Sequence, residues 1–593
     1  MKIRLADYIA DFLVAHNINT VFSVTGGGAM HLNDALGKKS KLNVYYNHHE
    51  QACAIAAEGY TRITNRPACV CVTTGPGGTN AISGVFGAYV DSIPMLIISG
   101  QVKYNTTVRS TNMNLRQLGD QEFDITKCVQ SLTKYAVMVE RADEIKYHLE
   151  KALYLAKNER PGPCWLDIPL NIQSEIIESD NLKGFNEIIE SVTKINNKTV
   201  ETVWELLNKA KRPLFFAGSG IRLSDGYDIF LKLLEKTNIP CVTAWNSNDL
   251  LDNNHTCYAG RPGTVGERVG NFMVQNADLL VVLGSRLNIR QISYNYENFG
   301  KNAYKIVVDI DKLELQKPTI QPDMTINCNV LDFMKKLLDI SHKTQCQEWI
   351  DYKNKLIGLF SITQNDYYKQ SKVNPYCFIE SLTKSLKEKD VIACSNGSAC
   401  VVTFQAATMK KGQRFFTNSG SASMGYGLPA SIGACIANKK MSTICIEGDG
   451  SLQMNIQELQ TVVQNKLPIK IVVLNNGGYH SIRQTQNNFF AKPLVGIGPE
   501  SKDLSFPELE LISNAYKIPY YKIENHKEMD GIIDKFLKSD GYALLEVVLN
   551  DQPFTPKLSS RKLDDGTMLS ASLEDMYPFI DRNLYKELMI AEK

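Results

Sequence analysis

The segment that most constrains the fold is a strand–helix–strand pattern in the last third of the chain. Residues 443–447 form a short apolar run, residues 454–464 have the apolar spacing of a helix, and residues 469–474 form a second apolar run. This succession predicts one β-α-β unit with two parallel strands. Because the crossover of such a unit is right-handed, the carboxyl ends of both strands lie at the same edge of the sheet. Groups that directly follow the two strands should therefore meet.

Oxygen-bearing groups follow each of these strands. A Gly-Asp-Gly turn centred on Asp449 ends the first strand, and a run of asparagines and glycines that contains Asn476 and Gly478 ends the second. A carboxylate, an amide oxygen and a backbone carbonyl suit a Mg²⁺ ion that keeps other positions for phosphate oxygens and water. Gly450 and Ser451 then open the helix, where free N–H groups favour an anion. The competing interpretation is an ordinary β-α-β unit with glycine turns, which the combined spacing makes the less favoured one.

The length of the chain requires several domains, because 593 residues are too many for one hydrophobic core. Short apolar strands alternate with helical patterns in three successive segments, which predicts an α/β protein with three doubly wound, Rossmann-like parallel sheets. Polar stretches near residues 174–198 and 341–374 indicate linkers. The predicted units are residues 1–175, 190–340 and 370–550, followed by a C-terminal tail, 551–593.

The composition favours small-molecule chemistry over nucleic-acid or membrane binding, because 65 basic side chains nearly balance 63 acidic ones. The fourteen cysteines form no Cys-x-x-Cys pair, and several lie in apolar strand-like runs, which indicates reduced core residues. A nucleophilic cysteine stays an alternative, although no particular cysteine is marked for that role. The first thirteen residues predict an amphipathic helix, neither a signal peptide nor a membrane span. We expect a cytoplasmic protein.

The first unit carries a second group of motifs. Glu50 falls at the start of an Ala-rich helix, and a glycine-rich turn with Pro76 and Asn80 joins a later strand to the next helix. In isolation, a glutamate at a helix N-terminus is more often a favourable charge near the helix dipole than a catalytic group. Its combination with the other motifs favours a functional role.

Together these motifs resemble the thiamine diphosphate enzymes of the acetolactate synthase type. The resemblance extends from about residue 3 to 555. It rests on the following motifs: His49-Glu50-Gln51, residues 75–80, residues 100–102, Gln121-Glu122, Thr133-Lys134, residues 424–429, residues 448–450 and Asn475-Asn476. It implies the thiamine diphosphate-binding fold, with a pyrimidine-binding first unit, a nucleotide-binding middle unit and a third unit that binds the diphosphate and magnesium.

The resemblance also implies roles for individual residues. Asp449, Asn476 and the Gly478 carbonyl would hold magnesium on the diphosphate, while Glu50 would hydrogen-bond the aminopyrimidine. Protonation of that ring favours the tautomer whose nitrogen removes the proton from the thiazolium carbon. Gln121 would face the reacting carbons as a second catalytic residue. The implied cofactor contacts are Gly27, Pro76, Asn80, Ser398, Ala422, Met424, Gly450 and Ser451.

The middle unit has weaker motifs, a Gly-Ser-Gly turn at residues 218–220 and a Gly-Ser-Arg sequence that ends at Arg286. A bare Gly-x-Gly is equally compatible with tight turns in a doubly wound sheet. The set resembles the FAD-binding region of biosynthetic acetolactate synthases. That resemblance implies that Arg286 and Arg290 face the phosphates of the flavin nucleotide, and that Asp309 or Asp311 faces its ribose or adenine. A bound FAD would be structural, because the net carboligation transfers no electrons.

The sequence departs from the acetolactate synthase pattern near the expected acceptor pocket. Thr485 stands where these enzymes usually carry a tryptophan, and residues 114–120 make the loop before Gln121 longer. His480, Arg483 and Gln484 are polar where the family is more apolar. They would suit a polyhydroxylated acceptor, and a solvated loop is an equally favoured interpretation.

The sequence therefore predicts a carboligase that decarboxylates pyruvate and transfers the two-carbon unit to a second 2-keto acid. The alternatives are the same chemistry on a keto sugar or another carbonyl acceptor, simple decarboxylation, a flavin oxidase, and a non-catalytic paralogue that regulates a partner. The resemblance implies that active sites form between subunits, so we expect a homodimer or a homotetramer.

Overall fold

Three parallel sheets follow one another along the chain in the computed structural model, which describes residues 1–186, 195–562 and 564–590. In spatial order, the N-terminal sheet contains β3 (Asn43–Tyr46), β2 (Thr20–Ser23), β4 (Ala68–Val72), β5 (Met95–Gln101), β7 (Pro163–Pro169) and β6 (Tyr135–Met138). The middle sheet contains β10 (Cys241–Thr243), β9 (Pro213–Ala217), β11 (Leu279–Leu283), β12 (Tyr304–Asp309) and β13 (Met324–Asn327). The C-terminal sheet contains β15 (Arg414–Phe416), β14 (Val391–Cys394), β16 (Thr443–Gly448), β17 (Ile469–Asn475), β19 (Ala543–Val548) and β18 (Tyr520–Ile523).

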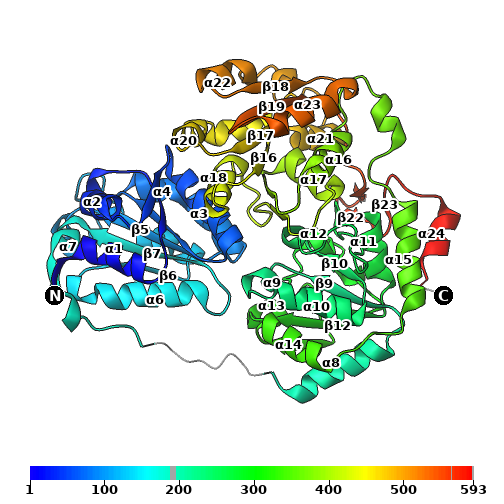
Figure 1. Ribbon diagram of the computed structural model, residues 1–593, viewed down its shortest axis with the longest axis horizontal. Coiled ribbons are helices and arrows are strands. Elements are labelled where there is room, and N and C mark those ends of the chain that lie inside the picture. Colours follow the sequence, from blue (N-terminus) through cyan, green and yellow to red (C-terminus); the bar gives the residue numbers. More distant parts are fainter. Residues whose placement is uncertain (187–194, 563, 591–593) are drawn as a thin grey trace.

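Helices pack around these sheets to form an N-terminal, a middle and a C-terminal unit (Figure 1). The N-terminal unit has α1 (Leu5–Ala15), α2 (Met30–Lys38), α3 (Glu50–Thr64), α4 (Pro76–Val90), α5 (Ile125–Val129), α6 (Ile145–Lys157) and α7 (Leu170–Ser174). The middle unit has α8 (Asn197–Lys209), α9 (Gly220–Leu223), α10 (Tyr227–Thr237), α11 (Arg268–Asn276), α12 (Ile289–Ile292), α13 (Lys312–Gln316) and α14 (Val330–Ile340), and α15 (Gln347–Leu359) follows it. The C-terminal unit has α16 (Pro375–Ser385), α17 (Gly397–Ala406), α18 (Gly427–Ala437), α19 (Asp449–Leu452), α20 (Glu458–Gln464), α21 (His480–Phe489), α22 (Leu509–Ala515) and α23 (His526–Lys538).

Each sheet is buried on both faces. In β4, Cys69 and Cys71 join one core, while the residues that alternate with them join another. β11 and β16 divide their side chains between two cores in the same way. Because strands buried on both faces need apolar residues at every position, they produce the continuous apolar runs seen in the sequence. The predicted α/β class with three doubly wound sheets is confirmed.

The start of the chain differs from the prediction of a helix from the first residue. Residues Lys2–Arg4 form strand β1, which pairs antiparallel with β8 (Ile176–Glu178), and α1 begins only at Leu5. β8 therefore lies within a stretch predicted to be a linker, and residues 187–194 of that stretch lie outside the described residues. This pairing joins segments far apart in sequence, which local periodicity cannot reveal.

The predicted β-α-β unit is present as β16, α19, α20 and β17. The helix predicted over residues 454–464 is divided, however, by a 3₁₀ turn (Gln453–Asn455) before α20 begins at Glu458. The Asn455 side chain donates to the Gly425 carbonyl at 2.8 Å. This tertiary contact holds the turn against the loop that precedes α18.

Helix α3 of the N-terminal unit packs tightly against α18 of the C-terminal unit (Figure 1). A Cβ atom on Gly433 would lie 1.8 Å from the Ala56 carbonyl oxygen, and one on Gly59 would lie 2.1 Å from that of Ala430. Only glycine fits at both positions, because the two helix backbones approach each other directly. This crossing fixes the N-terminal unit relative to the C-terminal unit.

The tail packs on the middle unit instead of extending from the C-terminal unit. Leu573, Leu588 and Met589 enter the same core as α11 and α15, and the last described helix is α24 (Arg582–Leu588). Two short strand pairs precede it: β20 (Lys557–Leu558) with β23 (Met576–Tyr577), and β21 (Ser560–Lys562) with β22 (Met568–Ser570). None of the helices in the described ranges has the length and apolar character needed to span a membrane.

Candidate functional site

The groups that follow β16 and β17 lie together at the carboxyl edge of the C-terminal sheet. The Asp449 carboxylate accepts hydrogen bonds from the backbone N–H groups of Gly478, at 2.7 Å, and Gly450, at 2.9 Å. Asn476 donates from its amide nitrogen to the Ser398 hydroxyl at 3.0 Å. Its amide oxygen is buried and has no hydrogen-bond partner in the described part of the chain. The convergence predicted from the strand ends is observed.

This set of donors fits a hard divalent cation. The unpartnered Asn476 amide oxygen, the Asp449 carboxylate and the Gly478 carbonyl are the oxygen types that Mg²⁺ accepts. The Gly478 carbonyl accepts one hydrogen bond, from the His480 N–H at 3.0 Å, which leaves its second lone pair free. The set contains one carboxylate, and the described residues contain no metal-holding cluster of three or more His, Cys, Asp or Glu.

Burial governs the charge state of Asp449. The residue is 5 % exposed, and loss of hydration raises the pKa of its carboxyl to about 6. The N–H donors of Gly478 and Gly450 and the positive charge of Arg483 act in the opposite direction. The carboxylate is therefore largely ionised at neutral pH and becomes protonated below about pH 6.

Neighbouring polar side chains hold the adjoining loops. The Ser451 hydroxyl lies 2.7 Å from that of Ser395 and accepts from the Gly425 N–H at 2.8 Å. Asn396 donates to the Ala422 carbonyl at 2.5 Å, and Ala422 has φ +53°, a region that glycine adopts more readily. The sequence interpretation placed residues 395–402 near the cofactor and named Ser398, but it did not name Ser395 or Asn396 as site residues. Their position directly after β14 was a usable signal, since β14 is the neighbour of β16 in the sheet.

A cavity of about 500 Å³ opens beside these groups. Trp245 of the middle unit and Phe554 of the tail form part of its wall. The volume is within the range of small-molecule sites and exceeds what a metal ion needs. Eight of the residues predicted to bind magnesium or thiamine diphosphate line it: Ser398, Ala422, Met424, Asp449, Gly450, Ser451, Asn476 and Gly478.

Glu50 lies at the carboxyl edge of the N-terminal sheet. It is the first residue of α3 and is 9 % exposed. The side-chain amide of Asn80 donates to Glu50 Oε2 at 3.0 Å. Pro76 is the first residue of α4, and Gly27 begins a 3₁₀ turn after β2. The structure thus brings Glu50 and Asn80 into contact and places Pro76 and Gly27 in loops at the same edge of the sheet.

Gln121 lies in a loop that a buried glutamate organises. The Glu122 carboxylate accepts from the backbone N–H groups of Val108, at 2.6 Å, and Leu118, at 2.9 Å. The Gln121 carbonyl oxygen lies 2.3 Å from the position that a Cβ on Gly75 would occupy. A side chain at Gly75 would therefore displace the loop, which rests directly on the glycine-rich turn.

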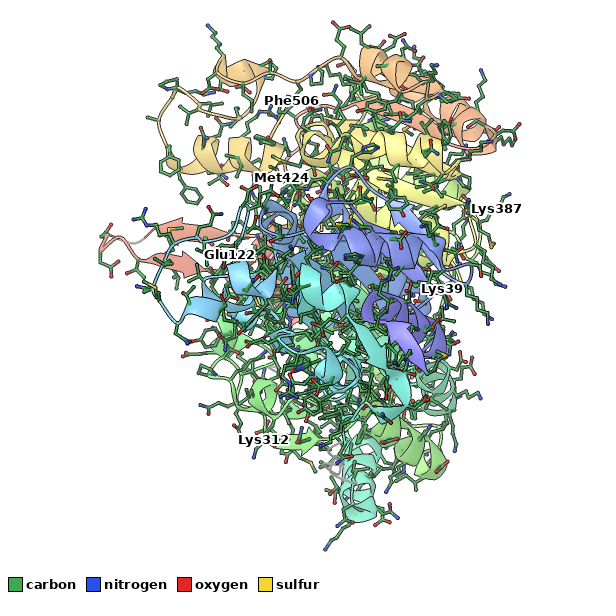
Figure 2. All side chains as sticks on the ribbon, turned by 90° about the vertical axis from the view of Figure 1, so that its left-hand side faces the viewer. Lys39, Glu122, Lys312, Lys387, Met424 and Phe506 are labelled. Atoms are coloured by element: carbon green, nitrogen blue, oxygen red, sulfur yellow. The ribbon has the colours of Figure 1, made fainter. Side chains whose placement is uncertain are left out.

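The predicted residues form two groups that do not share a cavity within one chain. Neither Glu50 nor Gln121 is among the described residues that line the cavity beside Asp449. Figure 2 shows Glu122 on the N-terminal unit, which faces the viewer, and Met424 on the C-terminal unit above it. One chain therefore presents two separate candidate half-sites.

A second cavity, of about 220 Å³, lies between the N-terminal and middle units. Arg286, Asp309 and Gly220 line it, and burial raises the pKa of Asp309 to about 6. Arg290 does not line this cavity but lines the larger one beside the metal-ligand candidates. Asn288 contributes to both walls. The two arginines that were predicted to face one ligand therefore line different cavities, whose walls share Trp245, Asn288 and Ser419.

The polar residues of α21 make contacts within the chain. His480 is 5 % exposed, with Nδ1 2.9 Å from the Asp551 carboxylate and Nε2 2.9 Å from the Gln552 carbonyl. Burial lowers the pKa of His480, and Asp551 acts against this shift. Thr485 is exposed and bonds within its own helix. His480 also lines the cavity beside Asp449, so its part in binding an acceptor stays a prediction.

Three family models match successive parts of the chain. They are described as the N-terminal TPP binding domain of thiamine pyrophosphate enzymes, at residues 3–126, the central domain, at 200–337, and the C-terminal TPP binding domain, at 395–547. The matched ranges together cover more than half of the chain. The chain belongs to the thiamine pyrophosphate enzyme family. The resemblance inferred from the motifs is confirmed. Thiamine pyrophosphate is another name for thiamine diphosphate, so the predicted cofactor is confirmed as that of the family.

Among thiamine pyrophosphate enzymes, acetolactate synthases match nearly the whole chain. The large subunit of acetolactate synthase isozyme 1 from Escherichia coli (strain K12) is 28% identical, over 91% of this chain and 93% of that protein. The acetolactate synthase large subunit of Lactococcus lactis subsp. lactis (strain IL1403) is 28% identical, over 95% and 96%. The chloroplastic acetolactate synthase 1 of Oryza sativa subsp. japonica is 29% identical, over 92% and 85%.

Proposed function

We propose that the chain is a thiamine diphosphate-dependent carboligase that decarboxylates pyruvate and transfers the two-carbon unit to a second 2-keto acid. Similarity to acetolactate synthases over more than 90% of the chain supports this reaction. The observation that carries it is the cavity beside Asp449 and Asn476, which has space for a small acceptor next to the diphosphate-binding groups. Two pyruvate anions and one proton give 2-acetolactate and carbon dioxide, so one carbon–carbon bond breaks and another forms.

The proposed roles follow from the two half-sites. Asp449, Asn476 and Gly478 would hold Mg²⁺ on the diphosphate. When bound, thiamine diphosphate supplies an electron sink for the bond that breaks in decarboxylation. Glu50 would hold a proton opposite the aminopyrimidine ring, and Asn80 would orient that carboxyl through its 3.0 Å hydrogen bond.

We also propose that the complete site forms between two copies of the chain, so that a homodimer is the smallest active assembly. The position of Glu50 outside the cavity beside Asp449 supports this arrangement. A homotetramer built from two such dimers meets the same requirement. Mixing Glu50→Gln and Asp449→Asn chains tests the arrangement, because mixed dimers regain one intact site. Absence of any regained activity in confirmed mixed dimers would contradict it.

Proton NMR of the products formed from pyruvate, thiamine diphosphate and Mg²⁺ tests the reaction. We expect 2-acetolactate, and we expect Glu50→Gln to slow its formation by about 100-fold or more, the usual effect of losing a general acid–base group. Glu144→Gln, on the exposed surface of the same unit, is the matched control and should leave the rate unchanged. Equal rates for Glu50→Gln and the control would refute the role of Glu50.

The same assay identifies the acceptor. If product forms only when a keto sugar is added, the acceptor is that sugar and not a second 2-keto acid. Acetaldehyde as the main product would instead indicate simple decarboxylation. Neither outcome changes the proposed roles of Glu50 and Asp449.

We further propose that FAD binds in the cavity between the N-terminal and middle units. The position of Arg286 beside the Gly-Ser-Gly turn supports phosphate binding, and Asp309 lies in the same cavity. A flavin absorption band in the purified protein, lost in Arg286→Met, is the expected result. Failure of the protein to retain added FAD would contradict this proposal, and bleaching of the flavin by pyruvate would indicate a flavin oxidase.

We retain the predicted division into a pyrimidine-binding unit (1–175), a nucleotide-binding middle unit (190–340), a diphosphate-binding unit (370–550) and a tail (551–593). Each matched family range falls within one of the first three units, which supports the division. The cytoplasmic location stays a prediction from the sequence.

A further inference from the structure

Arg483 is a buried arginine in contact with the loop that carries the proposed magnesium ligands. Its side chain is 7% exposed. One terminal nitrogen donates to the Asn476 carbonyl at 3.2 Å, and the other donates to the Gly477 carbonyl at 2.8 Å. The planar fork of the guanidinium therefore spans two successive peptide groups of the loop between β17 and α21.

The loop has few side chains of its own that could fix its shape. Gly477 has φ +69° and Gly478 has φ +121°, so both residues adopt conformations that favour glycine. A Cβ on Gly478 would lie 2.0 Å from the Ile497 carbonyl oxygen, so no larger residue fits there. Glycine loses more conformational freedom on ordering than any other residue, so contacts from outside the loop must hold it in place. Arg483 supplies two such contacts.

The acidic neighbours of Arg483 do not by themselves explain its burial. Its Nε atom lies 3.0 Å from the Glu500 carboxylate, and a terminal nitrogen lies 3.5 Å from that of Asp551. The side chains of these two acids are 48% and 67% exposed, respectively. Ion pairs with such exposed groups contribute little to stability. The two short contacts with loop carbonyls are the features that require a guanidinium at this position.

We propose that Arg483 is a positioning residue for magnesium and thiamine diphosphate. It holds the peptide groups of Asn476 and Gly477, so that the Asn476 amide oxygen and the Gly478 carbonyl stay aligned with the Asp449 carboxylate. The inference rests on the proposed function, because it takes these three groups as the metal ligands. Arg483 would act through the loop and would not touch the reacting atoms.

Calorimetric titration of the cofactor-free protein with thiamine diphosphate, at a series of Mg²⁺ concentrations, tests the inference without turnover. Arg483→Met should raise the Mg²⁺ concentration for half-maximal cofactor binding by about 10-fold or more, as loss of a ligand-orienting partner usually does. Arg483→Lys keeps the charge but loses the fork, so an intermediate increase is expected. Lys492→Met is the matched control, because Lys492 pairs with Glu500 at 3.6 Å and has no hydrogen bond or ion pair with the loop in the described part of the chain.

The outcomes separate positioning from a structural role. If Arg483 has only a structural role, Arg483→Met should have a lower urea midpoint than the wild type but the same Mg²⁺ requirement. That result would overturn the inference. If Arg483→Met does not fold, an unchanged requirement in Arg483→Lys overturns it equally. Failure of the wild-type protein to bind thiamine diphosphate at any Mg²⁺ concentration would instead refute the proposed function and the inference with it.

Discussion

Replacement of Gly433 by alanine should destabilise the contact between the N-terminal and C-terminal units. The added Cβ would lie 1.8 Å from the Ala56 carbonyl oxygen, whereas ordinary contacts begin at 3.4 Å, so the helices must separate locally by roughly 1.5 Å. Overpacking of this kind costs about 3 kcal/mol when backbone atoms block relaxation. Alanine recovers about 1 kcal/mol through its higher helix propensity. We therefore expect a net loss of about 2 kcal/mol in the free energy of unfolding.

Urea unfolding followed by far-ultraviolet circular dichroism measures this loss, with Gly531→Ala as the matched control. Gly531 lies on α23, and a Cβ there would meet no atom within 4 Å. The control should keep or slightly raise the urea midpoint, because only the propensity gain applies. A midpoint for Gly433→Ala equal to or above that of the wild type would refute the reasoning about the helix crossing.

Three further predictions follow from the buried carboxyls and from one strained residue. Burial raises the pKa of Asp449 to about 6, so the affinity of the cofactor-loaded site for Mg²⁺ should fall about tenfold per pH unit below that value. An Mg²⁺ affinity, measured by calorimetry, that stays constant from pH 5 to 7 would contradict this. Burial also raises the pKa of Asp167 from 3.8 to about 7, so its favourable contribution is complete below about pH 4 and is lost as the pH rises to 7. Asp167→Asn should therefore reduce the fall in the free energy of unfolding, measured by urea titration, as the pH rises from about 4 to 7. An equal fall in the variant and the wild type would exclude Asp167 as its source. Ala422→Gly should raise the melting temperature, since the left-handed φ of Ala422 costs about 1 kcal/mol, and a lower melting temperature would show that this strain is absent.

Local patterns were sufficient for the elements that carry the candidate C-terminal half-site. Apolar runs marked β16 and β17, and the residues directly after them, Asp449 and Asn476, lie at one edge of the sheet. This works because strand periodicity and right-handed crossovers are short-range properties of a β-α-β unit. The placement of Glu50 at the start of α3 was predictable for the same reason.

Contacts between distant segments were not predictable from these patterns. The strand β1 pairs with β8 across more than 170 residues, and Arg286 and Arg290 line different cavities although they lie close in sequence. Arg483 was interpreted either as a residue for a polar acceptor or as part of a solvated loop, yet its guanidinium donates to the carbonyls of Asn476 and Gly477. Its charge gave no indication of which way the side chain points.

The sequence by itself therefore determined the fold class, the ends of the strands and the chemical groups placed there, because these follow from periodicity and turn chemistry within single units. Only the tertiary structure decided how the units meet. The crossing at Gly59 and Gly433 brings α3 onto α18 and leaves Glu50 outside the cavity beside Asp449. That outcome depends on the close approach of two helices that lie more than 350 residues apart. A glycine on each helix, Gly59 on α3 and Gly433 on α18, permits contact between the backbones because it has no side chain.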